Sequence, residues 1–254
     1  MISRYEATLN GISLESINPA ILLTDISYDP PSRRYSTYAV AKRDGSRVYR
    51  AYKEKSSVTV QFAIREYDTM KRQSICQQIC AWARNGGTLR TNDRDGQMLK
   101  CICEQLPSIP SVLQWTEPLS ITFAAYELPY WQDVNLSTLT LSGTSNNGTI
   151  YIPGSAPDTV MEVEVTAGAE ITALELTVED TTLTLSGLSV ASGNSIVISY
   201  DDHMIQSIKT GSTSLLNKRT GADDLIAKCG QFNLVSYTAN ASCDVTFRGR
   251  GLWE

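Results

Sequence analysis

Four of the six cysteines have a spacing that could bind a metal ion. Cys76 and Cys80 lie one helical turn apart, and Cys101 and Cys103 would share one face of a strand, so four thiolates could surround Zn²⁺. However, CxxxC followed by CxC is not the CxxC…CxxC spacing of zinc ribbons, and reduced cysteine packs well as a small hydrophobic residue. The first residues also lack the basic segment and apolar run of a secretory signal, which favours reduced thiols. We therefore expect six reduced cysteines, no metal and no cofactor.

Other residues that could perform chemistry are isolated. The only histidine, His203, follows Asp201 and Asp202 where a tight turn would close a strand, which indicates a solvated turn. Asp93 and Asp95 resemble the start of a calcium loop, but the glutamate that should end such a loop is absent. The chain has no GxSxG, HExxH, GxGxxG or Walker-type motif. The sequence thus predicts a protein that works by contacts rather than an enzyme.

The most highly charged stretch is RRYSTYAVAKRDGSRVYRAYKEK, residues 33–55. It carries eight lysine and arginine side chains against two acidic ones, in a chain of formal net charge −5. Asp44-Gly45 can adopt the positive φ of a two-residue turn, and β-branched and aromatic residues flank it. These features predict a β-hairpin from Tyr38 to Lys53.

A turn at this position predicts which residues of the hairpin face each other. The expected pairs are Lys42 with Arg47, Val40 with Tyr49, and Tyr38 with Ala51. Both faces would then carry apolar and charged side chains, whereas a hairpin that packs only on its own domain has one apolar and one polar face. The like-charged pair would be unfavourable unless an anionic group came close. We therefore expect an arm that contacts a partner through Tyr38, Val40, Lys42, Arg43, Arg47, Val48, Tyr49 and Arg50.

The segments after the hairpin predict a β-rich domain with one helix. SSVTVQFAIRE alternates apolar and polar residues, as expected of a half-buried strand. Asp68 can cap a helix that stops at Gly86-Gly87. The core-facing stripe of this helix would consist of Ile75, Cys76, Ile79, Trp82 and Ala83. Two strands around a turn at 93–96 and the strand LSITFAAYE would complete the domain.

The pattern of apolar and polar residues changes after YELPYWQD. From residue 135 onward, short alternating runs such as VMEVEVTA, TTLTLSG and NSIVISYDD end at Gly, Asn or Asp, which predicts an antiparallel sandwich. Residues 1–133 hold 16 basic and 14 acidic side chains, net +2, while residues 134–254 hold 6 and 13, net −7. We expect two separately folded domains, 1–133 and 134–254, joined near Leu128 to Asn135. With 42% hydrophobic and 19% charged residues the chain is globular, and no stretch is long enough to span a membrane.

The order of these segments resembles a known family. The segments are LTDISYDPPSRR before the hairpin, the helix with its NGG stop, YELPYWQD, and LTLSGLSVASGNSIVISYDDHMIQSIKTGSTSLL. Together they resemble the distal tail protein of phages with long, non-contractile tails, over the whole chain. The fold class that this resemblance implies is mainly β. It combines an N-terminal β-sandwich or barrel-like ring-forming domain, with one α-helix and a hairpin arm, and a C-terminal galectin-like antiparallel β-sandwich.

The resemblance also implies a function and a set of partners. Six copies would form a ring at the tail tip, which joins the tail-tube protein above to a tail-associated hub protein below. The tape-measure protein and receptor-binding proteins are further candidate partners. The protein would be assembled in the host cytoplasm and located in the virion, with no membrane contact and no specific nucleic acid. The galectin sugar signature of His, Asn, Arg and Trp residues cannot be assembled from residues 135–254, so no sugar binding is implied.

Two other functions fit parts of the sequence. The basic hairpin with its tyrosines could bind nucleic acid as a β-ribbon, but its domain has a net charge of only +2 and the pI of the chain is about 5.1. The sandwich could be a carbohydrate-binding module or a glycan hydrolase, which would require exposed aromatic residues. The aromatic residues of 135–252 are scattered, and we expect them to lie in the core: Tyr151, Tyr200, Phe232, Tyr237 and Phe247.

Overall fold

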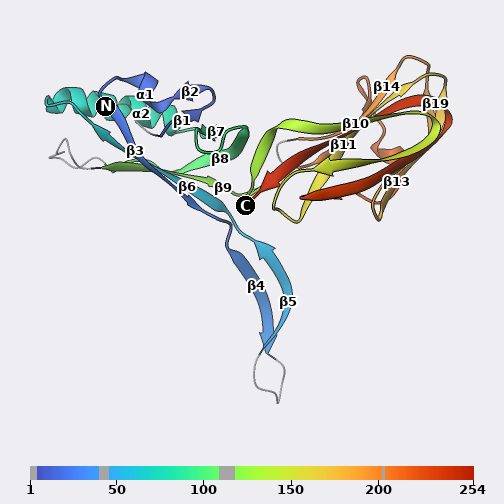
Figure 1. Cartoon of the computed structure of the whole chain (residues 1–254), viewed down its shortest axis with the longest axis horizontal. Helices are drawn as coiled ribbons and strands as arrows, with labels where there is room; N and C mark the ends of the chain where they lie inside the picture. The colour runs from blue at the N-terminus through green and yellow to red at the C-terminus, as the bar shows by residue number, and fades with distance from the viewer. Residues whose placement is uncertain (1–4, 40–45, 109–117, 202–203) are drawn as a thin grey trace. The chain divides into compact units, whose positions relative to one another are not determined.

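The chain forms two compact units. The computed structural model describes residues 5–39, 46–108, 118–201 and 204–254. One unit comprises Met1–Trp131 together with Glu254, and the other comprises Gln132–Trp253. The prediction of a mainly β, antiparallel fold is confirmed (Figure 1). No helix in the described ranges has the length and apolar character that crossing a membrane requires.

Apart from the hairpin, the described residues of the first unit form seven antiparallel strands. They pair in the order β2 (Ile12–Ser13), β1 (Ala7–Leu9), β7 (Gly87–Thr91), β8 (Gln97–Gln105), β9 (Leu119–Ala125), β6 (Ser56–Ile64) and β3 (Ile21–Asp29). The first part of β8 pairs with β7 and its second part with β9, so one strand joins two halves of the sheet. The alternation predicted for β6 is confirmed, since every second residue from Ser56 to Ile64 is buried.

Helix α2 (Thr69–Ala83) covers the buried face of this sheet. The Asp68 carboxylate accepts hydrogen bonds from the backbone amides of Met70 (2.8 Å) and Lys71 (3.4 Å), which confirms the predicted N-cap. The helix ends before Gly86, whose φ of +61° and close approach to the Cys101 carbonyl leave no room for a Cβ atom. A second helix that the sequence pattern did not predict, α1 (Leu14–Ile17), spans a single turn.

The predicted stripe of α2 is confirmed with two differences. Ile75, Cys76, Ile79 and Ala83 are buried. Trp82 is only half-buried: its indole packs edge-on against Phe123, with ring centroids 6.0 Å apart, and its Nε1 donates to the Ile12 carbonyl (3.0 Å). Arg72 also lies on the buried face, where its guanidinium donates to the Thr69 hydroxyl (3.3 Å). A charged residue on this face is a tertiary feature that apolar periodicity does not reveal.

The cap of α2 can be tested by substitution. Replacing Asp68 with alanine leaves the Met70 and Lys71 amides without their acceptor, so the free energy of unfolding should fall by about 1 kcal/mol. Asp68→Asn should lose much less, because an asparagine side chain also accepts these bonds. Urea unfolding followed by circular dichroism measures both. Equal stability of Asp68→Ala and the wild type would contradict the capping role.

The second unit is a sandwich of two antiparallel layers. Its elements are β10 (Trp131–Ile152), β11 (Asp158–Ala167), β12 (Ile171–Val178), β13 (Thr181–Val190), β14 (Ser195–Tyr200), β15 (Gln206–Thr210), β16 (Thr213–Ser214), the 3₁₀ turn η1 (Leu216–Lys218), β17 (Arg219–Gly221), β18 (Ile226–Lys228) and β19 (Gln231–Trp253). One layer is β17-β13-β12-β19 and the other is β15-β14-β11-β19. The inner faces of both layers form one hydrophobic core, in which Leu176, Ile198, Val235 and Phe247 are fully buried.

Two long strands serve both layers, where the sequence pattern indicated only short strands. Residues 235–239 of β19 pair with β12, and residues 243–249 pair with β11. Strand β10 follows both parts of β19, since Thr140 contacts Thr246 (3.0 Å) and Ser145 contacts Thr238 (3.4 Å) through their hydroxyls. Gly143, which the pattern marked as a strand end, is therefore a bend within the continuous strand β10.

Candidate assembly interface

The hairpin forms a two-stranded sheet of its own. Strand β4 (Arg33–Ala39) begins shortly after β3 ends, and β5 (Ser46–Lys53) leads into β6. Figure 1 shows that β4 and β5 extend beyond the ends of β3 and β6. A two-stranded ribbon is only marginally stable by itself in water. Its conformation therefore depends on what holds its base and on what covers its faces.

The register of the hairpin differs from the predicted one. The structure pairs Tyr38 with Arg47 and Ala39 with Ser46, so the prediction that Tyr38 faces Ala51 is wrong. A bulge between Ser36 and Thr37 adds to the shift: Ser36 pairs with Arg50 but Thr37 pairs with Val48, which makes Tyr49 the extra residue. The expected pair of Lys42 with Arg47 is excluded because Arg47 faces Tyr38, and that of Val40 with Tyr49 is excluded because Tyr49 is the bulged residue.

The described part of the ladder already differs from the register that an Asp44-Gly45 turn would set. Residues 40–45, which include the predicted Asp44-Gly45 turn, lie outside the described residues. The last described pair of the ladder is Ala39 with Ser46. The like-charged pair that the structure does contain is Arg33 opposite Lys53, at the base of the hairpin. A hairpin register follows from the loop and the bulge together, and neither can be read from the Asp-Gly pair alone.

Both faces of the hairpin expose apolar side chains. Tyr35 and Val48 belong to one face and are 52% and 56% exposed, while Tyr38 and Tyr52 belong to the other and are 49% and 42% exposed. A monomeric protein gains nothing from apolar side chains on both sides of a ribbon, and exposed apolar clusters mark sites of protein contact. We call these four residues the arm tyrosine–valine set.

The structure describes part of the predicted interface. Tyr38 and Val48 are exposed, as an interface residue must be in a single copy. Val40, Lys42 and Arg43 lie outside the described residues. Strand β5 contains Arg47, Tyr49 and Arg50, of which only the backbone pairing is described. The sequence interpretation missed Tyr35 and Tyr52, although their alternation with polar residues in RRYSTY and YRAYK was visible.

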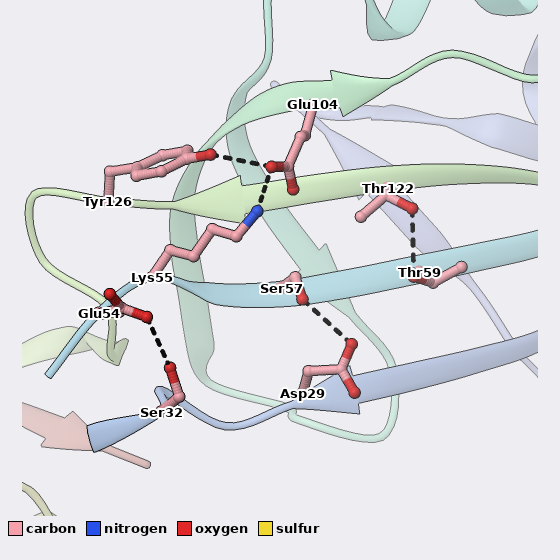
Figure 2. Close-up of polar contacts among 9 residues, drawn as sticks. All are labelled: Asp29, Ser32, Glu54, Lys55, Ser57, Thr59, Glu104, Thr122 and Tyr126. Atoms are coloured by element: carbon pink, nitrogen blue, oxygen red, sulfur yellow. Dashed lines mark hydrogen bonds and ion pairs between the residues drawn. The ribbon is translucent and has the colours of Figure 1, made fainter. Parts of the chain in front are cut away.

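The base of the hairpin is tied to the unit by polar contacts (Figure 2). The Glu54 carboxylate accepts hydrogen bonds from the Ser32 hydroxyl and the Arg34 guanidinium, each at 3.1 Å, and the Glu54 amide donates to the Ser32 carbonyl (2.9 Å). Where β3 and β6 begin to pair, the Ser57 hydroxyl donates to the Asp29 carboxylate (3.1 Å). These bonds join the segments that lead into the two strands of the ribbon, where it leaves the sheet.

Two basic residues at the end of β5 and just after it, Lys53 and Lys55, contact their own unit. Lys55 forms an ion pair with Glu104, whose carboxylate also accepts a hydrogen bond from the Tyr126 hydroxyl (2.9 Å) (Figure 2). Lys53 pairs with Glu254 and lies over the ring of Tyr130, 5.2 Å from its centroid. The ion pairs of Lys53 and Lys55 are therefore made within one copy.

The Lys55–Glu104 contact predicts a measurable pKa shift. The hydrogen bond from Lys55, followed by that from Tyr126, lowers the pKa of Glu104 from its ordinary value. A lowered pKa in the folded state means that the contact stabilises the base above the ordinary carboxyl pKa and is lost as the pH falls through the lowered value. In Lys55→Met the pKa of Glu104, followed by NMR titration, should rise toward the ordinary value. An unchanged pKa would show that Lys55 does not contact Glu104 in solution.

The residues singled out as candidate metal ligands do not gather. Within the parts of the chain that the structure describes, no three cysteine, histidine or acidic side chains are placed to hold a metal ion. All six cysteines are free thiols, and burial raises the pKa of Cys76 to about 11 and that of Cys101 to about 12. Asp93 accepts a hydrogen bond from the Tyr28 hydroxyl (2.5 Å). His203 lies outside the described residues.

The prediction that the aromatic residues of the second unit all lie in the core is wrong. Tyr237 and Phe247 are buried, and the Tyr237 hydroxyl donates to the Gly143 carbonyl (2.9 Å). Tyr151 and Phe232 are exposed and touch each other, with ring centroids 5.2 Å apart. Periodicity missed this pair because both residues occupy outward positions of their strands, β10 and β19.

Comparison with known proteins gives a result for structure only. No protein-family model matches the chain, and no curated protein sequence matches it. Its structure is similar to that of the Dit (gp 19.1) protein of phage SPP1, with a TM-score of 0.72 and 12% sequence identity over 97% of this chain and 98% of that one. The SPP1 protein is described as a paradigm of the hub adsorption apparatus in phages that infect Gram-positive bacteria.

Two structures of the activated phage P2 baseplate, with Ca and with Sr, also match. Their TM-scores are 0.44 and 0.45, at 9% and 10% identity, over 94% and 97% of this chain and 98% and 97% of those chains. The match to the SPP1 protein extends over both units and includes nearly every residue of each chain. The chain therefore has the fold of the Dit protein of phage SPP1.

Proposed function

We propose that this protein is the hub of a phage tail tip, in which six copies form a ring that joins the tail tube to the distal tail proteins. The observation that carries the proposal is the hairpin arm, a ribbon with apolar side chains exposed on both faces, in a chain with the fold of a phage hub protein. The first unit would form the ring, and the second would lie outside it. The hexamer is what the family resemblance implies.

A ring would supply neighbouring surfaces that cover the exposed apolar side chains of the arm. Each arm can place one face on the first unit of its own copy and the other on the next copy or on the tail tube. The arm tyrosine–valine set then becomes buried. A rotationally closed assembly repeats this contact at every subunit. Acidic groups on the neighbour would then lie opposite the lysines and arginines near the arm tip.

The proposed role is structural and not enzymatic, and the proposed location is the virion tail. A tail hub works by joining a tube above it to a hub protein below it, which requires surfaces rather than a reactive site. The tape-measure protein and receptor-binding proteins are proposed as further neighbours. No specific nucleic acid and no membrane take part in this proposal.

The experiment that tests the function is a mass measurement on the full-length protein. Native mass spectrometry, alone and with purified tail-tube protein from the same phage, should detect a species of about 167 kDa, six times the 27.9 kDa chain. Electron microscopy should show this species as a ring at the end of the tube. A protein that remains a single copy under both conditions, and binds DNA with a strong salt dependence, would support the nucleic-acid function instead.

A further inference from the structure

The second unit exposes a small apolar cluster on the outer face of one layer. Tyr151 of β10 and Phe232 of β19 are 46% and 69% exposed, their ring centroids are 5.2 Å apart and their planes are inclined at 56°. Leu234, the next outward residue of β19, is 54% exposed, while Val235 beside it is fully buried. These three residues, which we call the aromatic cluster, therefore do not contribute to the core. Exposed apolar clusters of this kind mark binding sites.

Three strands lie side by side at the aromatic cluster. The hydroxyl contact of Ser145 with Thr238 and the ring contact of Tyr151 with Phe232 fit one antiparallel register of β10 and β19. On the other side of β19, its residues 235–239 pair with residues 174–178 of β12. The outward side chains of β10, β19 and β12 therefore share one continuous surface, with the aromatic cluster at one end of it.

The polar part of this surface is rich in hydroxyl groups. The polar side chains at the outward positions are Ser145, Asn147 and Thr149 of β10, Ser236 and Thr238 of β19, and Glu175, Thr177 and Glu179 of β12. A hydroxyl group can donate and accept a hydrogen bond, and a carboxylate accepts only. A ligand that carries many hydroxyl groups of its own matches such a surface.

The charge of the surface excludes some ligands. Among the described outward residues of β10, β12 and β19 on this face, only Glu175 and Glu179 carry a charge. The Glu179 carboxylate accepts a hydrogen bond from the Leu234 amide (2.6 Å), which places it beside the aromatic cluster. Residues 134–254 also have a net charge of −7. A nucleic acid or another polyanion would be repelled here, whereas a neutral ligand would not.

The exposed apolar area is small for a protein partner. An aromatic side chain has an area of about 150–250 Å², so the exposed parts of Tyr151 and Phe232 amount to roughly 200 Å² together. A stable protein–protein interface buries about 800 Å² on each partner. The area of the cluster is thus more suitable for a single ring system than for the face of another domain.

A sugar ring has both of the required properties. A pyranose ring of the glucose type carries C–H groups on its two faces and hydroxyl groups around its rim. One face can stack on an aromatic ring while the rim forms hydrogen bonds with hydroxyl and carboxylate side chains. From Phe232 to Thr238 the strand extends about 20 Å at 3.4 Å per residue, which gives room for several linked rings.

We propose that the aromatic cluster binds a neutral glycan, with one sugar ring stacked on Phe232 and Tyr151 and the following rings hydrogen-bonded along the hydroxyl-rich surface. Exposed aromatic residues are what a carbohydrate-binding sandwich requires, and the folded structure supplies them. The cluster consists of a tyrosine, a phenylalanine and a leucine, so it contains none of the residue types of the galectin sugar signature. The site belongs to a single copy and goes beyond the proposed hub function.

Phe232→Ala in the full-length protein is the first test. Wild type and variant are applied to a panel of immobilised oligosaccharides that includes neutral members, such as cellohexaose and N-acetylchitohexaose, and the acidic hexagalacturonate. The wild type should bind neutral members in preference to the acidic one. Phe232→Ala should weaken this binding roughly 5- to 100-fold, the range known for a base that loses its aromatic stacking partner. Phe232→Trp should retain binding, because it keeps an aromatic ring at this position.

Matched controls come from exposed residues elsewhere. Tyr67→Ala removes a tyrosine that is 84% exposed on the first unit, and Val197→Ala truncates a residue that is 37% exposed on the other layer of the sandwich. Both should bind neutral oligosaccharides like the wild type. No binding of the wild type to any neutral member, stronger binding to the acidic one, or equal losses in Phe232→Ala and the controls would each overturn the site.

Thr238→Val tests the direction in which the glycan extends. This substitution keeps the shape of the side chain and removes a hydroxyl group about 20 Å from Phe232. Binding of a hexasaccharide should weaken roughly 2- to 12-fold through loss of one hydrogen bond, while binding of the matching disaccharide should not change. Isothermal titration calorimetry measures both lengths. An equal loss for both lengths, or no loss for the hexasaccharide, would overturn the placement along the strands.

The failure of this inference differs from the failure of the hub function. If the protein forms rings on tail tubes but binds no neutral glycan, the hub function stands and the glycan site is wrong. If it binds neutral glycans through Phe232 but forms no multi-copy species even with tail-tube protein, the site stands and the ring is wrong. If Phe232→Ala instead abolishes binding of a purified tail protein, the cluster is a protein interface and the inference is overturned.

Discussion

A chain with Tyr38→Ser and Val48→Ser should fold normally and fail to form rings. About half of each side chain is exposed in a single copy. Burying these exposed halves on association would contribute about 2–3 kcal/mol of binding free energy per interface for the two residues together. Their loss should lower each association constant roughly 30- to 150-fold, and the loss is repeated at every interface of a ring. Native mass spectrometry should then detect single copies at concentrations where the wild type is assembled.

The control for the arm variant is Tyr151→Ser, in which an exposed tyrosine of the second unit is removed. It should assemble like the wild type, and both variants should have unchanged circular dichroism because neither residue belongs to a core. Separate variants of the two faces, Tyr35 with Val48 and Tyr38 with Tyr52, would show which face contacts the neighbouring copy. If all arm variants still form rings on tail tubes, the arm is not the assembly surface.

Phe123→Ala and Phe247→Ala should each destabilise one unit only. Both side chains are fully buried, Phe123 in the first unit and Phe247 in the second. Truncating a buried phenylalanine leaves a cavity and costs about 3–5 kcal/mol. In differential scanning calorimetry, each substitution should lower the unfolding temperature of its own unit by at least roughly 10 °C and leave the other transition in place.

Phe232→Ala is the matched control for the core variants. Phe232 is 69% exposed, so its truncation should change the free energy of unfolding by no more than about 0.5 kcal/mol. Limited proteolysis of Phe123→Ala should degrade the first unit and leave a fragment that begins close to residue 132. A single transition that shifts as a whole in both core variants would mean that the two units do not fold separately.

The features that the sequence predicted correctly are those that depend on near neighbours. Asp68 caps α2 because its carboxylate reaches amides two and three residues ahead, whatever the rest of the chain does. Strand β6 follows from an alternation contained within nine residues. Gly86 ends the helix through a backbone conformation that other residues rarely adopt.

The arm shows where local patterns stop being sufficient. Its strands and its exposed tyrosine and valine were predicted, but its register was not, and the bulge at Tyr49 shifts the pairing further. An Asp-Gly pair permits a tight turn without requiring one. Since a shift of one residue moves side chains to the opposite face, the exact composition of each face was decided by the folded structure.

The polar and aromatic contacts at the base of the arm were decided by tertiary structure alone. Lys55 meets Glu104, and Tyr28 meets Trp131, only because β3, β6, β8 and β9 pair side by side. Likewise, whether an aromatic residue of the second unit is buried, as Phe247 is, or exposed, as Phe232 is, depends on which layer covers it. The sequence by itself determined the local elements, because their periodicity and caps are short-range. Only the pairing of distant strands determined which side chains share a site, because no short-range pattern records a contact across dozens of residues.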